Sequence, residues 1–288
     1  MPMKLTRRLL WPLAILLLVI CQPLRAGELF YLGEKIPDVQ KPWDSASYQQ
    51  MIAALQKLDK TQANALPRRS GEFTGPIYLR MVSVENFKPQ LNIYAPLELR
   101  QNEARELLFQ LKELMRLYFD FGAKQQPYGA EALGLMTYSM QQQAVLFTLT
   151  TEFWTTLSPT EQSNPVRLKG LQETKAAAAM LTASALDYLE LSKQFSQEDL
   201  VLYGAELGKQ LPGLFVHLPS DVRPQLLARI DSLSRQHPYP QVRNSLTELL
   251  PVLLMIQADV EKQQAQPLKR PAPAASKLDL SAPKEPQL

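Results

Sequence analysis

Three residues near the C-terminal end of the sequence have the types that make a hydrolytic triad. Asp231, Ser234 and His237 are three residues apart in the stretch RIDSLSRQH and share one face of the helix expected there. In a working triad the aspartate contacts the histidine, but here the serine lies between them. The helical rise separates Asp231 from His237 by about 9 Å. We interpret these residues as a solvated helix face and predict no catalytic residue among them.

The motifs that usually carry metal, phosphate or acyl-transfer chemistry do not occur in the sequence. The two histidines, His217 and His237, are twenty residues apart, and Cys21 is the single cysteine. There is no HExxH pair, no glycine-rich phosphate loop and no GxSxG elbow. The sequence therefore predicts no metal site and no cofactor, and it favours a protein that is not an enzyme.

Two acidic residues could take part in catalysis, so an enzyme remains one of the hypotheses. Glu152 is the only acid between Glu131 and Glu161, and Asp120 lies between aromatic residues in YFDFG. A buried Glu152 would need a partner or a raised pKa. Acids that meet in a cleft would make an acid-residue enzyme, whereas the commoner interpretation is a surface acid near the end of a helix.

One uncharged stretch of the sequence is as long as a membrane span. Ala132 to Thr151 are twenty residues without a charge, but Gln141, Gln142 and Gln143 point in directions about 100° apart around a helix. An unpaired amide is costly in hydrocarbon. We therefore predict an inner helix of a bundle and no transmembrane span in the processed chain. Its predicted core residues are Leu135, Met136, Met140, Leu146, Phe147 and Leu149.

A second uncharged stretch, Ala176 to Leu186, is too short to cross a membrane. Its small side chains let neighbouring helices approach closely, so we predict a second inner helix. Two alternatives remain open for the interior of the bundle. One is a cavity lined by Gln142, Thr148 and Glu152, and the other is a face that binds a partner.

Aromatic residues gather in the sequence around the start of the uncharged helix. If they converge, they form an apolar groove suited to a peptide or a lipid chain; otherwise they belong to the core. These residues are Tyr118, Phe119, Phe121, Tyr128 and Tyr138. Our candidates for binding a ligand or partner are Tyr118, Phe119, Phe121, Tyr138, Gln142 and Glu152.

Helical periodicity and capping residues predict a mainly α fold over residues 44–263, either a multi-helix bundle or an irregular α-helical array. Asp44 or Ser45 caps the first helix, and Ser158, Asn164 and Ser196 cap later ones. The predicted helices cover residues 44–60, 97–121, 129–157, 165–192, 196–217, 220–236 and the chain from Pro240 onward.

Residues 77–95 are the best candidate for β structure. Ile77 to Val84 is rich in β-branched and aromatic residues, and Gln90 to Tyr94 could pair back on it. Because Pro89 interrupts the pattern, a small β-hairpin and an extended strap over the helices are both open. We predict an irregular segment over residues 27–43.

The N-terminus has the three parts of a secretory signal peptide. A basic head precedes an apolar run from Leu9 to Ile20, and small residues follow a helix-breaking proline. We predict a signal peptide over residues 1–26, cleaved after Ala26. An uncleaved anchor and lipidation of Cys21 are the alternatives. At the other end, residues 264–288 are rich in proline, alanine and lysine and are predicted to be a disordered tail.

Charge argues against a nucleic-acid partner. The chain has 31 basic and 28 acidic residues, and four of the basic ones lie in the predicted signal peptide, which leaves 27. The processed chain is therefore close to neutral and lacks the excess of positive charge that nucleic acids attract.

These observations lead to three functional hypotheses. The first is an exported, non-catalytic helical interaction protein of the bacterial envelope, periplasmic or secreted. Its partner would be an envelope protein, and it would act as an adaptor or as an immunity or inhibitor protein. The second is a periplasmic carrier that binds an apolar ligand between inner helices. The third, and least favoured, is the acid-residue enzyme.

Overall fold

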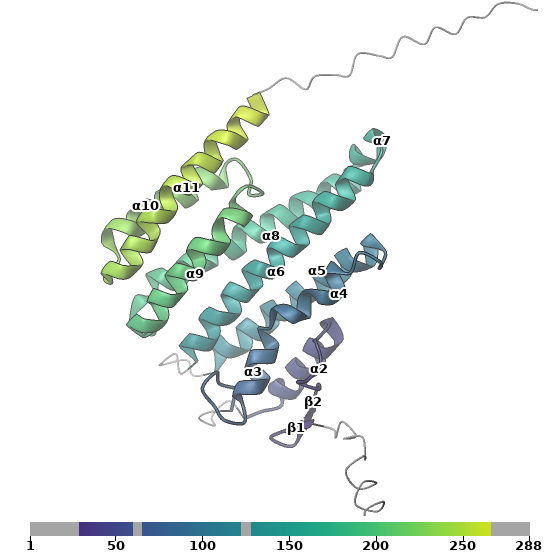
Figure 1. Cartoon of the computed structure of the whole chain (residues 1–288), viewed down its shortest axis with the longest axis vertical. Coiled ribbons are helices and arrows are strands. Elements are labelled where there is room, and N and C mark those ends of the chain that lie inside the picture. The colour runs from purple at the N-terminus through teal and green to yellow at the C-terminus, as the bar shows by residue number, and fades with distance from the viewer. Residues whose placement is uncertain (1–28, 60–64, 122–127, 266–288) are drawn as a thin grey trace, which may run out of the picture.

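The computed structural model of the chain describes residues 29–59, 65–121 and 128–265. This part of the chain is mainly α and forms a helical array with one small hairpin, which confirms the predicted fold class (Figure 1). The predicted signal peptide, with Cys21 and Ala26, lies outside the described residues, and so does the predicted tail from residue 266 onward.

Most helices begin where the sequence predicts. Asp44, Asn164 and Ser196 each accept a hydrogen bond from a backbone N–H of the first turn, and Ser158 forms a capping box with Glu161. The helices are α2 (Ser45–Gln56), α3 (Gly75–Met81), α4 (Lys88–Leu91), α5 (Leu97–Asp120), α6 (Gly129–Thr156), α7 (Pro159–Gln162), α8 (Pro165–Glu190), α9 (Gln197–Phe215), α10 (Val222–Gln236) and α11 (Pro240–Ala265), with short 3-10 turns η1 (Val84–Phe87) and η2 (Ser192–Gln194).

The hairpin lies in a different place from the predicted one. Strands β1 (Leu29–Tyr31) and β2 (Glu34–Ile36) pair antiparallel within the segment that we expected to be irregular. Leu32 and Gly33 join them, both with positive φ, as a tight two-residue hairpin turn requires. Residues 77–95 form α3, η1 and α4, so the hairpin and the extended strap predicted there are both wrong.

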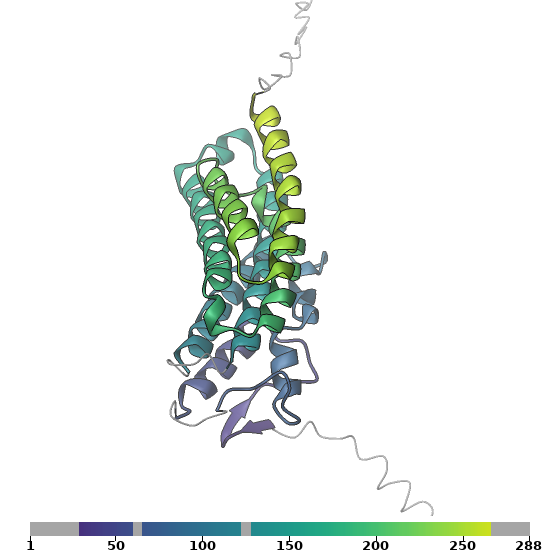
Figure 2. The ribbon, with the colours of Figure 1, turned by 90° about the vertical axis from the view of Figure 1, so that its left-hand side faces the viewer.

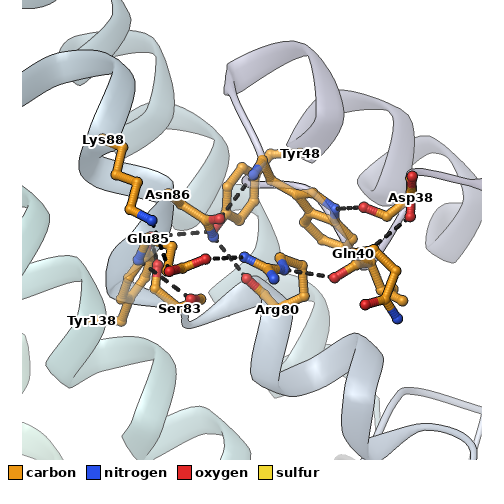
Figure 3. A network of polar contacts seen from close by, with 11 residues as sticks. Asp38, Gln40, Tyr48, Arg80, Ser83, Glu85, Asn86, Lys88 and Tyr138 are labelled. Atoms are coloured by element: carbon orange, nitrogen blue, oxygen red, sulfur yellow. Dashed lines mark hydrogen bonds and ion pairs between the residues drawn. The ribbon is translucent and has the colours of Figure 1, made fainter. Parts of the chain in front are cut away.

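Tertiary contacts explain why most of residues 77–91 are helical. The Nδ2 group of buried Asn86 donates to Tyr48 Oη at 2.9 Å and to the Arg80 carbonyl at 2.7 Å. Its Oδ1 accepts from the Trp43 backbone N–H at 2.8 Å. Figure 3 shows Asn86 between Tyr48 and Arg80 at the centre of a larger polar network. Because a fully bonded buried amide favours one arrangement of its neighbours, these contacts outweigh the local preference for strand.

Helix α6 is the central element of the fold. It packs against α5, α8 and α9, and it contributes side chains to two large buried apolar clusters. All six core residues predicted in α6 are buried, which confirms that part of the prediction. Within the described residues, no helix combines the length and the apolarity needed to cross a membrane.

The buried apolar residues form two large clusters that both include residues of α6. One joins the hairpin, α2 and α3 to α5 and the first part of α6, and the other joins α6 to α8, α9, α10 and α11. Figures 1 and 2 show the long helices running side by side, with the hairpin and α3 gathered at one end. Helix α6 therefore links two bodies of core packing.

Helix α8 is not the inner helix that its uncharged stretch predicted. It buries Ala178, Thr182 and Ala185 against its neighbours, but Met180 in the same stretch is 64% exposed. The small residues do allow close packing on one side, as expected. The other side faces an open groove beside α6, because no described helix covers it.

Candidate functional site: an apolar groove over helix α6

An open groove lies between three helices. Its floor is α6 and its walls are α5 and α8, both of which pack against α6. The groove has a volume of about 700 Å³, which is within the ~300–1,000 Å³ common for ligand sites. Its apolar walls include Leu108, Phe109, Met115 and Phe119 from α5 and Met180 and Leu181 from α8.

Helical spacing places these side chains in the groove. On α5, residues 105, 108, 109, 112, 115, 116 and 119 line it, so they form a second stripe beside the stripe that faces the core. Phe109 at 58% exposed and Met180 at 64% exposed stand at the two edges. Large apolar side chains gathered in one exposed hollow usually mark a binding surface.

Cations stand along the α5 wall. Arg105, Lys112 and Arg116 all line the groove. Arg116 is paired with Glu113 at 3.0 Å and with Asp120 at 3.2 Å, whereas no carboxylate among the described residues forms an ion pair with Arg105 or Lys112. This wall therefore offers two positive charges to a ligand.

The α8 wall brings one carboxylate to the groove. Asp187 is held at 2.8 Å by Arg229, which also binds Glu190 at 2.7 Å. The charge of Asp187 is therefore only partly compensated from outside the groove, because Arg229 is shared by two carboxylates. Tyr188 next to it is buried, and burial raises the pKa of its hydroxyl, so this group stays neutral.

The floor of the groove carries an unpartnered amide. Gln143 is 0% exposed, and neither its Nε2 nor its Oε1 has a hydrogen-bond partner within the described residues. Buried amides are nearly always hydrogen-bonded, because leaving one unpaired is costly. An unsatisfied amide on the floor of an apolar hollow indicates either that the amide takes part in ligand binding or that it lowers the stability of the folded chain.

The aromatic candidates do not converge on the groove as a group. Tyr118, Phe121 and Tyr138 are buried in the cluster that joins α2, α3 and α5. Tyr118 donates to the Pro67 carbonyl at 2.7 Å, and Tyr138 donates to the Ser83 carbonyl at 3.1 Å. Phe119 alone of the six candidates lines the groove, where its ring is 4.9 Å from the ring of Tyr188.

The two polar candidates, Gln142 and Glu152, make contacts between helices and do not line the groove. Gln142 is buried and donates to Gln90 Oε1 at 2.8 Å and to the Ala104 carbonyl at 2.9 Å, so it ties α4 and α5 to α6. Glu152 is half exposed and accepts from Arg100 at 2.8 Å. Thr148 is exposed. These positions do not support the predicted interior cavity lined by Gln142, Thr148 and Glu152, because Gln142 is buried whereas Thr148 and Glu152 are exposed.

The remaining acids have ordinary partners. Asp120 is exposed and pairs with Arg116, as expected for a surface acid near a helix end. Glu103 accepts hydrogen bonds of 2.7 and 2.8 Å from the backbone N–H and the hydroxyl of Ser45, and thereby joins α5 to α2. Asp231 pairs with Arg235 at 2.8 Å, so the three residues do not form a triad. The interpretation as a solvated helix face is wrong for His237, which is 2% exposed and whose Nε2 lies 3.2 Å from the Leu189 carbonyl.

Sequence reasoning missed most of the groove. Phe109, Lys112, Met180 and Gln143 were not among our candidates, although α5 carries a visible signal. Leu108 and Phe109 lie off its core-facing stripe, at the spacing that makes a second apolar face. The pairing of that face with α8 depends on tertiary structure and has no local signature.

Two further findings bear on function. Among the residues that the structure describes, no three His, Cys, Asp or Glu side chains are grouped so that they could hold a metal ion. Comparison of the chain with models of protein families, with curated proteins and with solved structures found no match of any of the three kinds.

Proposed function

We propose that this protein is a non-catalytic binding protein whose groove holds an amphiphile with one alkyl chain and an anionic headgroup, such as a fatty acid. The observation that carries the proposal is the open apolar groove over α6. It is lined along α5 from Arg105 to Phe119, a helical rise of about 21 Å. An extended alkyl chain can lie along this length and bury its methylenes.

The shape and the charge of the groove favour such an amphiphile. Each methylene removed from water contributes about 0.8 kcal/mol, so a longer chain is held more tightly until the groove is full. The carboxylate of the ligand would lie at the α5 edge near Arg105 and Lys112. Of our three hypotheses, these features support the carrier more directly than the protein adaptor.

We also propose that the protein acts outside the cytoplasm. The leader-like sequence of residues 1–26 supports export to the periplasm or beyond, where a fatty acid or related amphiphile needs a carrier to cross water. A reporter fused to residues 1–30 is expected to be exported. A reporter that stays in the cytoplasm would contradict the location while leaving the groove proposal intact.

The binding proposal is tested by titrating the protein with hexadecanoate and with hexadecyltrimethylammonium, below their micelle-forming concentrations, in a fluorescent-probe displacement assay. We expect hexadecanoate to bind at least about tenfold more tightly, a difference of about 1.4 kcal/mol, because the headgroups differ in the sign of their charge. Dodecanoate is expected to bind more weakly than hexadecanoate, since it buries fewer methylenes.

Matched substitutions locate the site. Ala177→Trp fills the groove from the α8 wall and is expected to abolish binding, whereas Ala258→Trp on the exposed side of α11 leaves it unchanged. Lys112→Gln should weaken hexadecanoate selectively, and Lys209→Gln on α9 serves as its control. If neither amphiphile binds while an acidic amphipathic peptide does, the groove is a protein-docking site and our first hypothesis replaces the carrier.

A further inference from the structure

A second, polar hollow lies at the other side of α8, where α9 ends and α10 begins. It has a volume of about 340 Å³ and is lined by Gln172 and Lys175 of α8, by the connection from Val216 to Ser220, by Arg223 of α10 and by Val260 of α11. It shares no lining residue with the groove over α6. The two sites are therefore separate.

Arg223 is the unusual member of this hollow. Its side chain is 2% exposed, and its Nη1 donates to the Leu218 carbonyl at 3.2 Å. Its Nε and Nη2 have no hydrogen-bond partner within the described residues. A guanidinium keeps its charge at every accessible pH, so a full positive charge is buried here with part of its hydrogen-bonding capacity unused.

The surroundings do not neutralise this charge. Among the described residues, no carboxylate forms an ion pair with Arg223 or with Lys175. Asp259, next to Val260, is paired with Lys262 at 3.7 Å. The N-terminus of α10 adds its partial positive charge, and the first turn of α10 has no acidic residue, although the N-cap residue itself is Asp221.

A buried charge without a counter-charge is one of the most unfavourable features that a protein can carry. Two cations that face one polar hollow, with a hydroxyl on Ser220 and an amide on Gln172 as further donors, suit a multiply charged oxygen anion. We propose that this hollow is an oxyanion site that binds a phosphate or sulfate group, with Arg223 and Lys175 as the charged ligands.

The experiment is titration of the full chain with inorganic phosphate, sulfate and glycerol 3-phosphate at constant ionic strength, followed by calorimetry and by NMR of the two histidines. His217 lies beside the hollow, within the electrostatic influence of Lys175, and stacks on Phe147 at 4.4 Å. His237 is at the far end of α10. We expect saturable binding that shifts the ring signals of His217 and leaves those of His237 in place.

The three probes distinguish the sources of the group. Tighter binding of glycerol 3-phosphate than of inorganic phosphate would assign the site to a phosphate ester, and the reverse order would assign it to the free ion. Either order supports the site. Equal, weak and non-saturable effects of all three probes, indistinguishable from those of chloride, would overturn it.

Two variants keep the test sharp. Lys175→Met removes a half-buried charge without disturbing the core and should weaken phosphate at least about tenfold, and Lys209→Met on α9 is its control. Arg223→Met should abolish binding and also the rise of Tm that phosphate gives the unmodified protein, while its own Tm in the absence of phosphate is equal or higher. Unchanged affinity in both hollow variants would contradict the assignment.

Discussion

Two adjacent glutamines on α6 show how one residue type serves opposite purposes. Gln142 and Gln143 are both fully buried. The amide of Gln142 donates two hydrogen bonds across helices, whereas Gln143 uses neither of its polar atoms. We expect the first to stabilise the fold, although its Oε1 has no partner within the described residues, and the second to cost stability at the floor of the groove. Because the two residues are of the same type and lie on the same helix, the stabilities of their matched variants can be compared directly.

Gln143→Leu is expected to raise the free energy of unfolding by about 1–3 kcal/mol, because it removes two unsatisfied polar atoms from a buried position. Gln142→Leu is expected to lower it by a similar amount, since it leaves Gln90 and the Ala104 carbonyl without their partner. Urea denaturation of both variants is the measurement. A loss of stability in both would mean that Gln143 has a partner and that the groove floor is not poised for a ligand.

The histidines make stability depend on pH. Burial lowers the pKa of His237, whose Nδ1 accepts from the Tyr239 N–H and whose Nε2 lies 3.2 Å from the Leu189 carbonyl. Burial, and then the charge of Lys175, lower the pKa of His217. Below the ordinary histidine pKa of about 6.5, the unfolded chain takes up protons that the folded chain refuses.

The stability that these neutral histidines provide is therefore complete above pH ~6.5 and is lost as the pH falls through their folded pKa values. We expect the free energy of unfolding to fall between pH 7 and pH 5, by up to about 1.4 kcal/mol per pH unit for each histidine. His237→Gln should make this fall shallower in urea titrations at a series of pH values. A slope equal to that of the unmodified protein would contradict the contribution of His237.

At the scale of elements, the segment α3–η1–α4 depends on Asn86. The asparagine joins this segment to α2 through Tyr48 and to the chain before it through Trp43. Asn86→Ala is expected to lower the free energy of unfolding by about 1–3 kcal/mol, because buried donors and acceptors lose their partners. Val84→Ala, a change of an exposed apolar side chain in the same turn, is the control. Equal effects of the two changes in thermal denaturation would show that the network does not hold the segment.

The same segment shows where local sequence is insufficient. Helix starts were predictable because capping side chains act on the first turn of their own helix, as at Ser158, Asn164 and Ser196. The helical structure within residues 77–95 was not predictable, because Asn86 in this segment binds partners about forty residues away, at Trp43 and Tyr48. A β-rich composition is a weak preference that such contacts override.

The candidate site was less predictable than the helices that form it. The buried state of α6 follows from its uncharged sequence, and the cores of α5 and α6 follow from helical spacing. The uncharged stretch of α8 alone does not show that α8 stays at the edge, although the charged residues on either side of that stretch distinguish α8 from α6. Their positions depend on packing against α9 and α10, so Met180 became a groove residue instead of a core residue.

At the scale of the whole molecule, the array is open along one side. Helix α6 is covered by α5, α8 and α9 but leaves the groove between α5 and α8 accessible. A ligand there would join the two walls and would stabilise the folded chain by mass action. With hexadecanoate at one hundred times its dissociation constant, we expect the free energy of unfolding to rise by about 2.7 kcal/mol. The gain should vanish in Ala177→Trp; the same gain in that variant would place the ligand elsewhere.

The central claim is that an anionic amphiphile lies along the groove over α6. The most direct measurement is photo-crosslinking with a hexadecanoate that carries a diazirine near the end of its chain, followed by mass spectrometry of the labelled peptides. We expect labels within residues 105–119 of α5, within residues 177–190 of α8 and at the adjoining Leu191, where the lining residues of the groove lie. These labels should be lost when unlabelled hexadecanoate is in excess. Labels that spread over α9, α10 and α11, or that excess ligand does not displace, would contradict it.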